Sequence, residues 1–386
     1  MQHDESKMIS LGGTIKRAVR LGIGSLPPRL RLNVDVVIGG ISDTYANWHL
    51  PAYRVRGRLH GVEREGQLIY FGELPQYKSW IANFFSDSGE VEPIGSYSLA
   101  AIAKRKGALS ECDVLVCPSN PMSRLLITEP GWFVIPKYIK CLIDLHKPVE
   151  QLVSRHAAKD DLRIARKKNY HFEVLRQEAA FDQFYHEMFV PTTQIRHEDR
   201  ANISSLETLK KAFKNGYLLA AYQEDEWVAA NLMVPQTGNV LNWANVGWRW
   251  GAEQLMKDRV VSALMFEMMV RGKNEGYDTL DLGSCNPFVN DGPLGYKLKW
   301  GAEMSLPLLS YEEDRLQGLK SYLSVHFNLE SEAARSMLRR SPVMDRYDGN
   351  LRALGYDAQP RSDFKRQVDE GLPWINLADP EISAQC

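Results

Sequence analysis

Polar and basic residues follow a short apolar run in the C-terminal half of the chain. The segment Asp281–Glu303 reads DLGSCNPFVNDGPLGYKLKWGAE, and Lys297 stands there beside Tyr296 and close to Trp300. A lysine fixed by aromatic rings can stabilise negative charge that develops on an oxygen atom during a reaction. Lys297 and Tyr296 are therefore candidate catalytic residues. The alternative is a surface lysine on a short helix, with Lys299 as its equivalent.

The same segment offers groups that could bind a nucleophile. Asp291 can deprotonate or position an attacking amine, or it can serve only as an ion-pair partner of the nearby lysine. Asn286 and Asn290 are candidate contacts to the substrate that carries the amine. Gly283 and Ser284 end the apolar run, where small residues let a ligand approach the backbone closely.

A second charged cluster reads RHEDR and occupies residues 196–200. His197 titrates near neutral pH and could relay a proton. Arg196 and Arg200 could bind a phosphate or carboxylate group of a substrate. The alternative is a solvated loop, because consecutive charged residues commonly face water.

The five cysteines are scattered, and none belongs to a C-x-x-C pair: Cys112, Cys117, Cys141, Cys285 and Cys386. This spacing favours a reducing compartment, with the cytoplasm as the default location. Cys285 lies beside Ser284 and invites a role as a nucleophile, but no neighbouring residue in the sequence would act as its base. The nine histidines show no metal-ligand spacing, so we expect no metal.

Length and composition indicate an ordinary globular protein. The 386 residues suffice for two medium domains or one large one, with 44% hydrophobic and 25% charged residues. The formal net charge is −1, which argues against wholesale coating of nucleic acid. No apolar run approaches the roughly 20 residues that a membrane span needs, so we expect no integral membrane insertion.

The N-terminal stretch at 13–33 is locally basic. It contains no acidic residue and five basic ones: Lys16, Arg17, Arg20, Arg29 and Arg31. Such a segment could contact an anionic membrane peripherally or bind RNA. The alternative is a poorly ordered leader over residues 1–32.

Three strands are predicted in succession at 217–223, 227–235 and 239–247, with short polar turns typical of an antiparallel meander. A long helix is predicted at 253–275, because apolar residues recur at every fourth position: Met256, Val260, Leu264 and Met268. A strand at 278–283 follows. A right-handed crossover should place it parallel to the third strand of the meander.

The loop before the predicted long helix reads WRWGA at 248–252. A helix N-terminus presents free amide groups and a positive dipole end, which suit an anion. Arg249, Gly251 and Lys257 are therefore candidates for binding a phosphate-bearing cofactor. The alternative is that Gly251 only ends a strand and that the two tryptophans belong to the core.

Helices are also predicted before the meander. One at 159–170 includes a basic group of which the first three members share a face: Arg163, Arg166, Lys167 and Lys168. Another at 181–189 has an apolar stripe, and a third at 205–215 begins with the capping pattern SLET. The first part of the chain is predicted to be α/β, with a strand at 33–40, a hairpin within 55–71, a helix at 96–106 and a strand at 112–117.

This order of elements resembles the GNAT acyltransferase fold, and most closely the branch of the Fem (FemAB-like) peptidyltransferases and BioF2-like acetyltransferase domains. The resemblance covers roughly the C-terminal half. It rests on the segments DLRIARKKNYHFEV, FYHEMFVPTTQIRHEDRA, LLAAYQEDEWVAANLMV and GYDTLDLGSCNPFVNDGPLGYKLKWGAE. One departure is that the usual (Arg/Gln)-x-x-Gly-x-(Gly/Ala) pyrophosphate signature is missing, since Arg249-Trp250-Gly251-Ala252 has different spacing.

The resemblance implies an α/β protein with a GNAT-like C-terminal half and a degenerate GNAT-like N-terminal half in tandem. The expected domains are a basic leader (1–32), a degenerate α/β domain (33–150), an acyltransferase domain (151–310) and a helical or irregular extension (311–386). In this family two strands separate to admit the acyl donor, and Lys297 matches the family lysine.

The activity implied by the resemblance is transfer of an acyl group from acyl-CoA, such as acetyl-CoA, to an amine. The acceptor would be a small molecule, a sugar or a cell-envelope precursor. One alternative is an aminoacyl-tRNA donor, whose phosphates would meet the basic helix at 159–170. Another is a GNAT-like binding module without catalytic activity.

Overall fold

The computed structural model describes residues 44, 48–73, 77–127, 129–197, 203–307, 321–362, 364 and 371–379. The basic leader, the strand expected at 33–40 and Arg200 lie outside these residues. The chain divides into two compact units. The first comprises residues 1–137, 307–359 and 375–386, and the second comprises residues 138–306 and 360–374.

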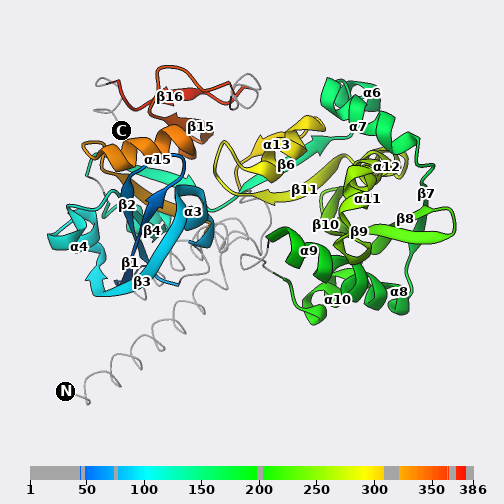
Figure 1. The fold of residues 1–386 in the computed structure, drawn as a ribbon, viewed down its shortest axis with the longest axis horizontal. Coiled ribbons are helices and arrows are strands. Elements are labelled where there is room, and N and C mark those ends of the chain that lie inside the picture. Colours follow the sequence, from blue (N-terminus) through cyan, green and yellow to red (C-terminus); the bar gives the residue numbers. More distant parts are fainter. Residues whose placement is uncertain are drawn as a thin grey trace, which may run out of the picture. The chain divides into compact units, whose positions relative to one another are not determined.

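A seven-stranded sheet forms the centre of the second unit, in the order β12-β6-β11-β10-β9-β8-β7 (Figure 1). Its strands are β6 (Ile139–Asp144), β7 (His171–Leu175), β8 (Tyr217–Gln223), β9 (Glu226–Gln236), β10 (Val240–Trp248), β11 (Thr279–Cys285) and β12 (Glu303–Ser305). The predicted meander is confirmed, because β8, β9 and β10 pair antiparallel in sequence order. The expected parallel return is also confirmed, since β11 pairs parallel to β10.

Helices cover both faces of this sheet. On one face, α8 (Glu178–Gln183), the π-helix η3 (Phe184–Phe189), α9 (Val190–His197) and α10 (Leu206–Lys214) lie close to the central strands. Leu218 and Leu232 pack there against Phe181 and Phe213. The opposite face meets α12 (Val260–Asn274), where the buried Asn231 of β9 donates a hydrogen bond to Met268. Alternate residues of each strand thus reach different helices, as the two-residue period of a strand requires.

The prediction of one continuous helix at 253–275 is wrong, because the structure has two helices there. The structure has α11 (Glu253–Lys257) and α12 (Val260–Asn274), with Arg259 between them at φ +63°. A left-handed conformation costs a non-glycine residue about 1–2 kcal/mol. Two ion pairs offset this cost at the break: Lys168 with Asp258 at 2.8 Å, and Arg259 with Asp161 at 3.2 Å.

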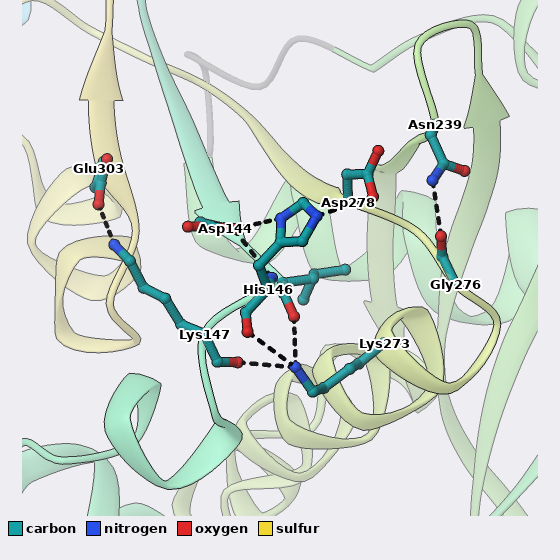
Figure 2. Close-up of polar contacts among 9 residues, drawn as sticks. Asp144, His146, Lys147, Asn239, Lys273, Gly276, Asp278 and Glu303 are labelled. Atoms are coloured by element: carbon teal, nitrogen blue, oxygen red, sulfur yellow. Dashed lines mark hydrogen bonds and ion pairs between the residues drawn. The ribbon is translucent and has the colours of Figure 1, made fainter.

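One end of β11 is held by a network of polar contacts (Figure 2). Lys273 of α12 donates hydrogen bonds to three successive carbonyls, those of Leu145, His146 and Lys147, at 2.7, 3.3 and 3.1 Å. The ring of His146 lies between the carboxylates of Asp144 and Asp278, at 3.0 and 3.2 Å. These contacts fix the end at which β11 begins, so any divergence of the strands falls at its other end.

The first unit contains a six-stranded sheet in the order β3-β1-β2-β4-β13-β5. Its strands are β1 (His49–Leu59), β2 (Glu65–Phe71), β3 (Phe85–Ser98), β4 (Val114–Ser119), β5 (Trp132–Pro136) and β13 (Tyr322–Phe327). The predicted hairpin is confirmed by the antiparallel pairing of β1 with β2. The helix predicted at 96–106 is shorter, because β3 continues to Ser98, whose side chain caps α4 (Leu99–Ala103).

The two sheets repeat one pattern of pairing. In each, an antiparallel pair leads to a parallel pair (β2 with β4, and β10 with β11), and two further antiparallel strands follow. The strand next to the parallel pair is exchanged in both sheets. β6 follows β5 in the sequence but pairs in the second sheet, and β13 follows β12 but pairs in the first. This repeated order is the expected tandem arrangement of two GNAT-like halves.

The region expected at 311–386 as a helical or irregular extension is therefore different. It supplies β13, α15 (Glu332–Arg340) and a small sheet of β14 (Val343–Tyr347), β15 (Asn350–Gly355) and β16 (Trp374–Asn376). All six residues of β13 are buried. β13 pairs with β4 on one edge and β5 on the other, and both of its faces are covered, since Ser324 and His326 are buried as well as Leu323, Val325 and Phe327.

Candidate active site

The parallel pair β10 and β11 separates after three residues. Pairing runs from Val240 with Thr279 to Asn242 with Asp281, although β10 continues to Trp248 and β11 to Cys285. Each strand is also irregular against its other neighbour at this point. β10 has a bulge between Trp243 and Asn245, and β11 has one between residues 281 and 284. We call the region beyond the last paired residues the strand divergence.

Gly283 sits in the bulge of β11 with φ +76°. A side chain would meet only ordinary contacts there, with Trp243 O at 3.7 Å and Lys297 Nζ at 4.0 Å, so conformation rather than space requires glycine. The Asp281 carboxylate holds the bulge, because it accepts hydrogen bonds from Gly283 N and Lys140 Nζ, both at 2.8 Å. Ser284, next to Gly283, is exposed.

Lys297 reaches the end of β11 from α13 (Gly292–Lys299). Its Nζ donates a hydrogen bond to the carbonyl of Ser284 at 2.9 Å, and its side chain is half-buried. The structure thus brings together three of the predicted site residues, Gly283, Ser284 and Lys297, at the strand divergence.

The aromatic rings expected to hold Lys297 instead hold Lys299. The Nζ of Lys299 lies 4.4 Å from the ring centre of Tyr296 and 5.9 Å from that of Trp300. For the closer ring the reason is helical spacing, since Tyr296 and Lys299 are three residues apart and share a face, whereas Tyr296 and Lys297 are adjacent and do not. Lys297 and Lys299 point to different partners, but Lys299 is not the exposed equivalent that the sequence suggested.

Lys299 belongs to a buried polar network centred on Asp161 of α7 (His156–Arg166). The Asp161 carboxylate meets Lys299 Nζ at 2.5 Å and Arg259 Nε at 3.2 Å, and it accepts a hydrogen bond from Ser262 at 2.8 Å. Ser262 gives its proton to Asp161, so Tyr296, at 3.4 Å, donates to Ser262 in turn. Burial raises the pKa of the Tyr296 phenol above its usual value, which keeps that proton in place.

The sequence analysis missed this network. Asp161 falls within the helix predicted at 159–170 and Ser262 within the helix predicted at 253–275, and neither is among the candidate site residues. The available signal was the combination of Ser262 and Arg259 within an otherwise apolar helical repeat, since a buried hydroxyl requires a partner.

Asp291 caps α13. Its carboxylate accepts hydrogen bonds from the backbone N–H of Leu294 at 3.1 Å and from the side-chain amide of Asn286 at 2.9 Å. Burial raises the pKa of Asp291, while the Asn286 bond, the Leu294 bond and the charge of Lys297 lower it. The predicted residues Asn286 and Asp291 are thus paired with each other, and Asn290 is exposed beside them.

The residues predicted to bind a cofactor phosphate have protein partners instead. Arg249 bonds Glu187 at 3.1 Å and the carbonyl of Trp227 at 2.9 Å. Gly251 has φ +63°, a left-handed conformation that favours glycine whatever the space around it, so its backbone conformation explains the residue type. Lys257 forms an exposed i,i+4 ion pair with Glu253 at 2.9 Å.

The cluster at 196–200 is only partly described. Arg196 is exposed, and its guanidinium lies 5.6 Å from the ring centre of Trp248 at the end of β10. His197 ends α9, and Arg200 lies outside the described residues.

The basic face predicted on α7 is largely engaged within the protein. Arg163 lies 3.6 Å from Asp160, Arg166 lies 6.0 Å from the ring centre of Phe266, and Lys168 pairs with Asp258. Arg163 and Lys168 therefore present less net positive charge to RNA phosphates than the sequence alone indicates, because each has an acidic partner.

The described part of the chain offers neither a metal-ligand cluster nor a membrane-spanning helix. No group of three or more His, Cys, Asp and Glu side chains there is arranged to hold a metal ion. No helix among the described residues is long and apolar enough to cross a membrane.

Strand order, the parallel crossover and the strand divergence define the second unit as a GNAT-like α/β fold. No family model matches the chain. A comparison with curated proteins also finds no match.

The chain is similar in fold to several solved structures. One is the C-terminal domain of a putative lysylphosphatidylglycerol synthetase from Agrobacterium fabrum, with 11% identity, 75% of this chain and 84% of that chain covered, and a TM-score of 0.37. Another is FemX, with 11% identity, coverage of 75% and 92%, and a TM-score of 0.37. A third is a GCN5-related N-acetyltransferase from Sphaerobacter thermophilus, with 12% identity, coverage of 71% and 75%, and a TM-score of 0.29. At these TM-scores the fold assignment rests on the strand order and pairing described above.

Proposed function

We propose that this protein is an N-acyltransferase that moves an acyl group from acyl-CoA to an amine. The observation that carries the proposal is the strand divergence. Gly283 and Ser284 lie there near the end of β11, and the ammonium group of Lys297 donates a hydrogen bond to the carbonyl oxygen of Ser284. Beyond the divergence β10 and β11 no longer pair with each other, so their facing edges can receive a donor, and the cation of Lys297 lies beside the edge of β11.

Lys297 is the candidate catalytic residue. Attack of an amine on a thioester places negative charge on the carbonyl oxygen, and one positioned donor typically stabilises that charge by about 3–4 kcal/mol. The hydrogen bond to Ser284 holds Nζ in place before the reaction. Preorganisation of this kind is the source of the stabilisation.

The donor phosphates would bind at the start of α12. This helix has 15 residues, and no side chain caps its first turn. Uncapped amide groups and the helix dipole both favour an anion. Arg259 also has an acidic partner, Asp161, but it stands at that end of the helix with its side chain 41% exposed, so its position makes it the candidate cation in place of Arg249 and Lys257.

The acceptor would approach from the side of Asn290 and Arg196, whose side chains are exposed. Asp291 would position the amine through its remaining lone pairs, since each oxygen already accepts one hydrogen bond. A carboxyl whose pKa is raised by burial is also better placed to take a proton from an amine than an exposed one.

Thermal unfolding with and without CoA tests the donor. We expect CoA to raise Tm, since a ligand that binds only the folded state stabilises it. Arg259→Gly should reduce the shift, because glycine keeps the backbone conformation while the cation is removed. The control is Lys257→Ala, because alanine removes the charge and maintains the helix α11, whereas glycine would destabilise it. This variant should keep the CoA-dependent rise in Tm.

Absence of any CoA-dependent shift would contradict the acyl-CoA donor. The aminoacyl-tRNA alternative would then be tested by the salt dependence of tRNA binding. Binding of CoA without transfer to any amine in an acceptor panel would instead favour the inactive binding module.

A further inference from the structure

Two cysteines that the proposed transfer does not use lie side by side next to Lys297. Cys141 is on β6 and Cys285 is the last residue of β11, and these strands pair antiparallel. The bulge between Asp281 and Ser284 brings the two thiols together, with 3.7 Å between their sulfur atoms. Both side chains are buried, and neither belongs to a disulfide.

The surroundings favour a thiolate on one member of the pair. A hydrogen bond from Cys141 and the ammonium group of Lys297 lower the pKa of the Cys285 thiol, while desolvation opposes them. The described cysteines of the first unit differ, because burial raises the pKa of Cys112 and Cys117 to about 12. In such an arrangement the thiolate can be oxidised to a sulfenic acid, and the neighbouring thiol can then condense with it to form a disulfide.

We propose that Cys141 and Cys285 form a redox-sensitive pair that hydrogen peroxide converts to a reversible disulfide. The Cys285 thiolate attacks one peroxide oxygen, which breaks the O–O bond and gives a sulfenic acid and hydroxide. The Cys141 sulfur then attacks the sulfenic sulfur, an S–S bond forms and water leaves. In sum two thiols are oxidised, one peroxide is reduced to two waters, and both thiol protons end in water.

The sulfur atoms must approach from 3.7 Å to about 2.0 Å. Cys285 stands opposite Ile139, two residues from Cys141, so the bond would join diagonal neighbours on two paired strands. Closure removes the thiol beside Lys297 and links β6 to β11 at the strand divergence. Because the pair requires only the geometry of the two thiols, the proposal stands or falls separately from acyl transfer.

The test treats the reduced full-length protein with hydrogen peroxide, in a Cys386→Ser background that excludes the cysteine outside the described residues. We expect the intact mass to fall by two hydrogen atoms and one tryptic species to join the Cys141 and Cys285 peptides. Dithiothreitol should restore both masses. Cys141→Ser and Cys285→Ser, checked for unchanged folding in the reduced state, should each abolish the crosslink.

Cys117→Ser is the matched control, because it replaces a buried cysteine of the first sheet and should leave the crosslink intact. The proposal is overturned if peroxide leaves both thiols open to alkylation after unfolding. It is equally overturned if Cys285 gains oxygen atoms without becoming linked to Cys141.

Discussion

The Nζ atom of Lys297 donates a hydrogen bond to the carbonyl oxygen of Ser284 at 2.9 Å. This contact joins α13 to the end of β11 that no longer pairs with β10, and it holds a positive charge where the parallel strands have separated. A lysine in such a position can be structural, catalytic or both. Variants that separate folding from turnover distinguish these roles.

Lys297→Met should lower kcat by about 100–1000-fold with little change in the donor KM, because the charge that it faces develops only in the transition state. Steady-state kinetics with an acyl-CoA and an accepted amine measures this. Lys211→Met, on the exposed face of α10, is the control and should behave as wild type. Equal rates for Lys297→Met and wild type would remove the lysine from the mechanism.

Lys299→Met should instead destabilise the protein. It takes one cation from the Asp161 carboxylate, whose side chain is only 12% exposed, and a broken buried pair costs roughly 3 kcal/mol. Denaturant unfolding measures the loss. The double variant with Asp161→Asn should be less destabilised than the sum of the single changes, and strict additivity would argue against the network.

Gly283→Ala should lose about 1–2 kcal/mol of stability, because φ +76° disfavours any residue with a side chain. Gly276→Ala is a matched control, since Gly276 has φ +83° and open space around it. The two variants should unfold at similar denaturant concentrations, whereas only Gly283→Ala should impair transfer. Equal transfer activity in the two variants would show that the bulge of β11 has no part in the reaction.

His326 of β13 should make the protein sensitive to acid. Burial lowers the pKa of His326 to about 3, with a smaller contribution from the positive charge of Arg105. The Nδ1 atom of His326 has no hydrogen-bond partner among the described residues. Between this value and the usual pKa near 6.5, only the unfolded chain binds the proton, so stability falls as the pH falls through that window.

The expected loss from His326 alone is roughly 2–3 kcal/mol by about pH 4. His326→Phe keeps a ring beside Trp132 and should flatten the pH dependence. Unfolding free energies of both proteins at several pH values give the comparison. A constant difference across the window would show that His326 does not titrate as expected.

Local patterns were sufficient to predict the core of the second unit. The strands at 217–223, 227–235 and 239–247 lie within one residue of β8, β9 and β10, because short apolar strands with polar turns are specified by neighbouring residues. The fixed polar end of α13 was also foreseeable, since Asp291 precedes Gly-Pro at a helix start.

Long-range contacts set the limit of that prediction. The helix break at Arg259 has no glycine or proline to mark it and depends on Asp161 and Lys168, about 90 to 100 residues away in the sequence. Arg249 suits a phosphate by residue type, and only its contacts with Glu187 and Trp227 show that it is occupied. The sequences of β6 and β13 also do not indicate that each strand pairs in the sheet of the other half of the chain.

That exchange has a consequence for the order of folding during synthesis. The seven strands of the second sheet lie between residues 139 and 305, so this sheet is complete once that contiguous stretch has left the ribosome. The first sheet begins earlier in the chain but must wait for β13, Tyr322–Phe327, to fill the place between β4 and β5. The half that is translated first is therefore completed last, and its unpaired strand edges depend on timely synthesis of the C-terminal residues.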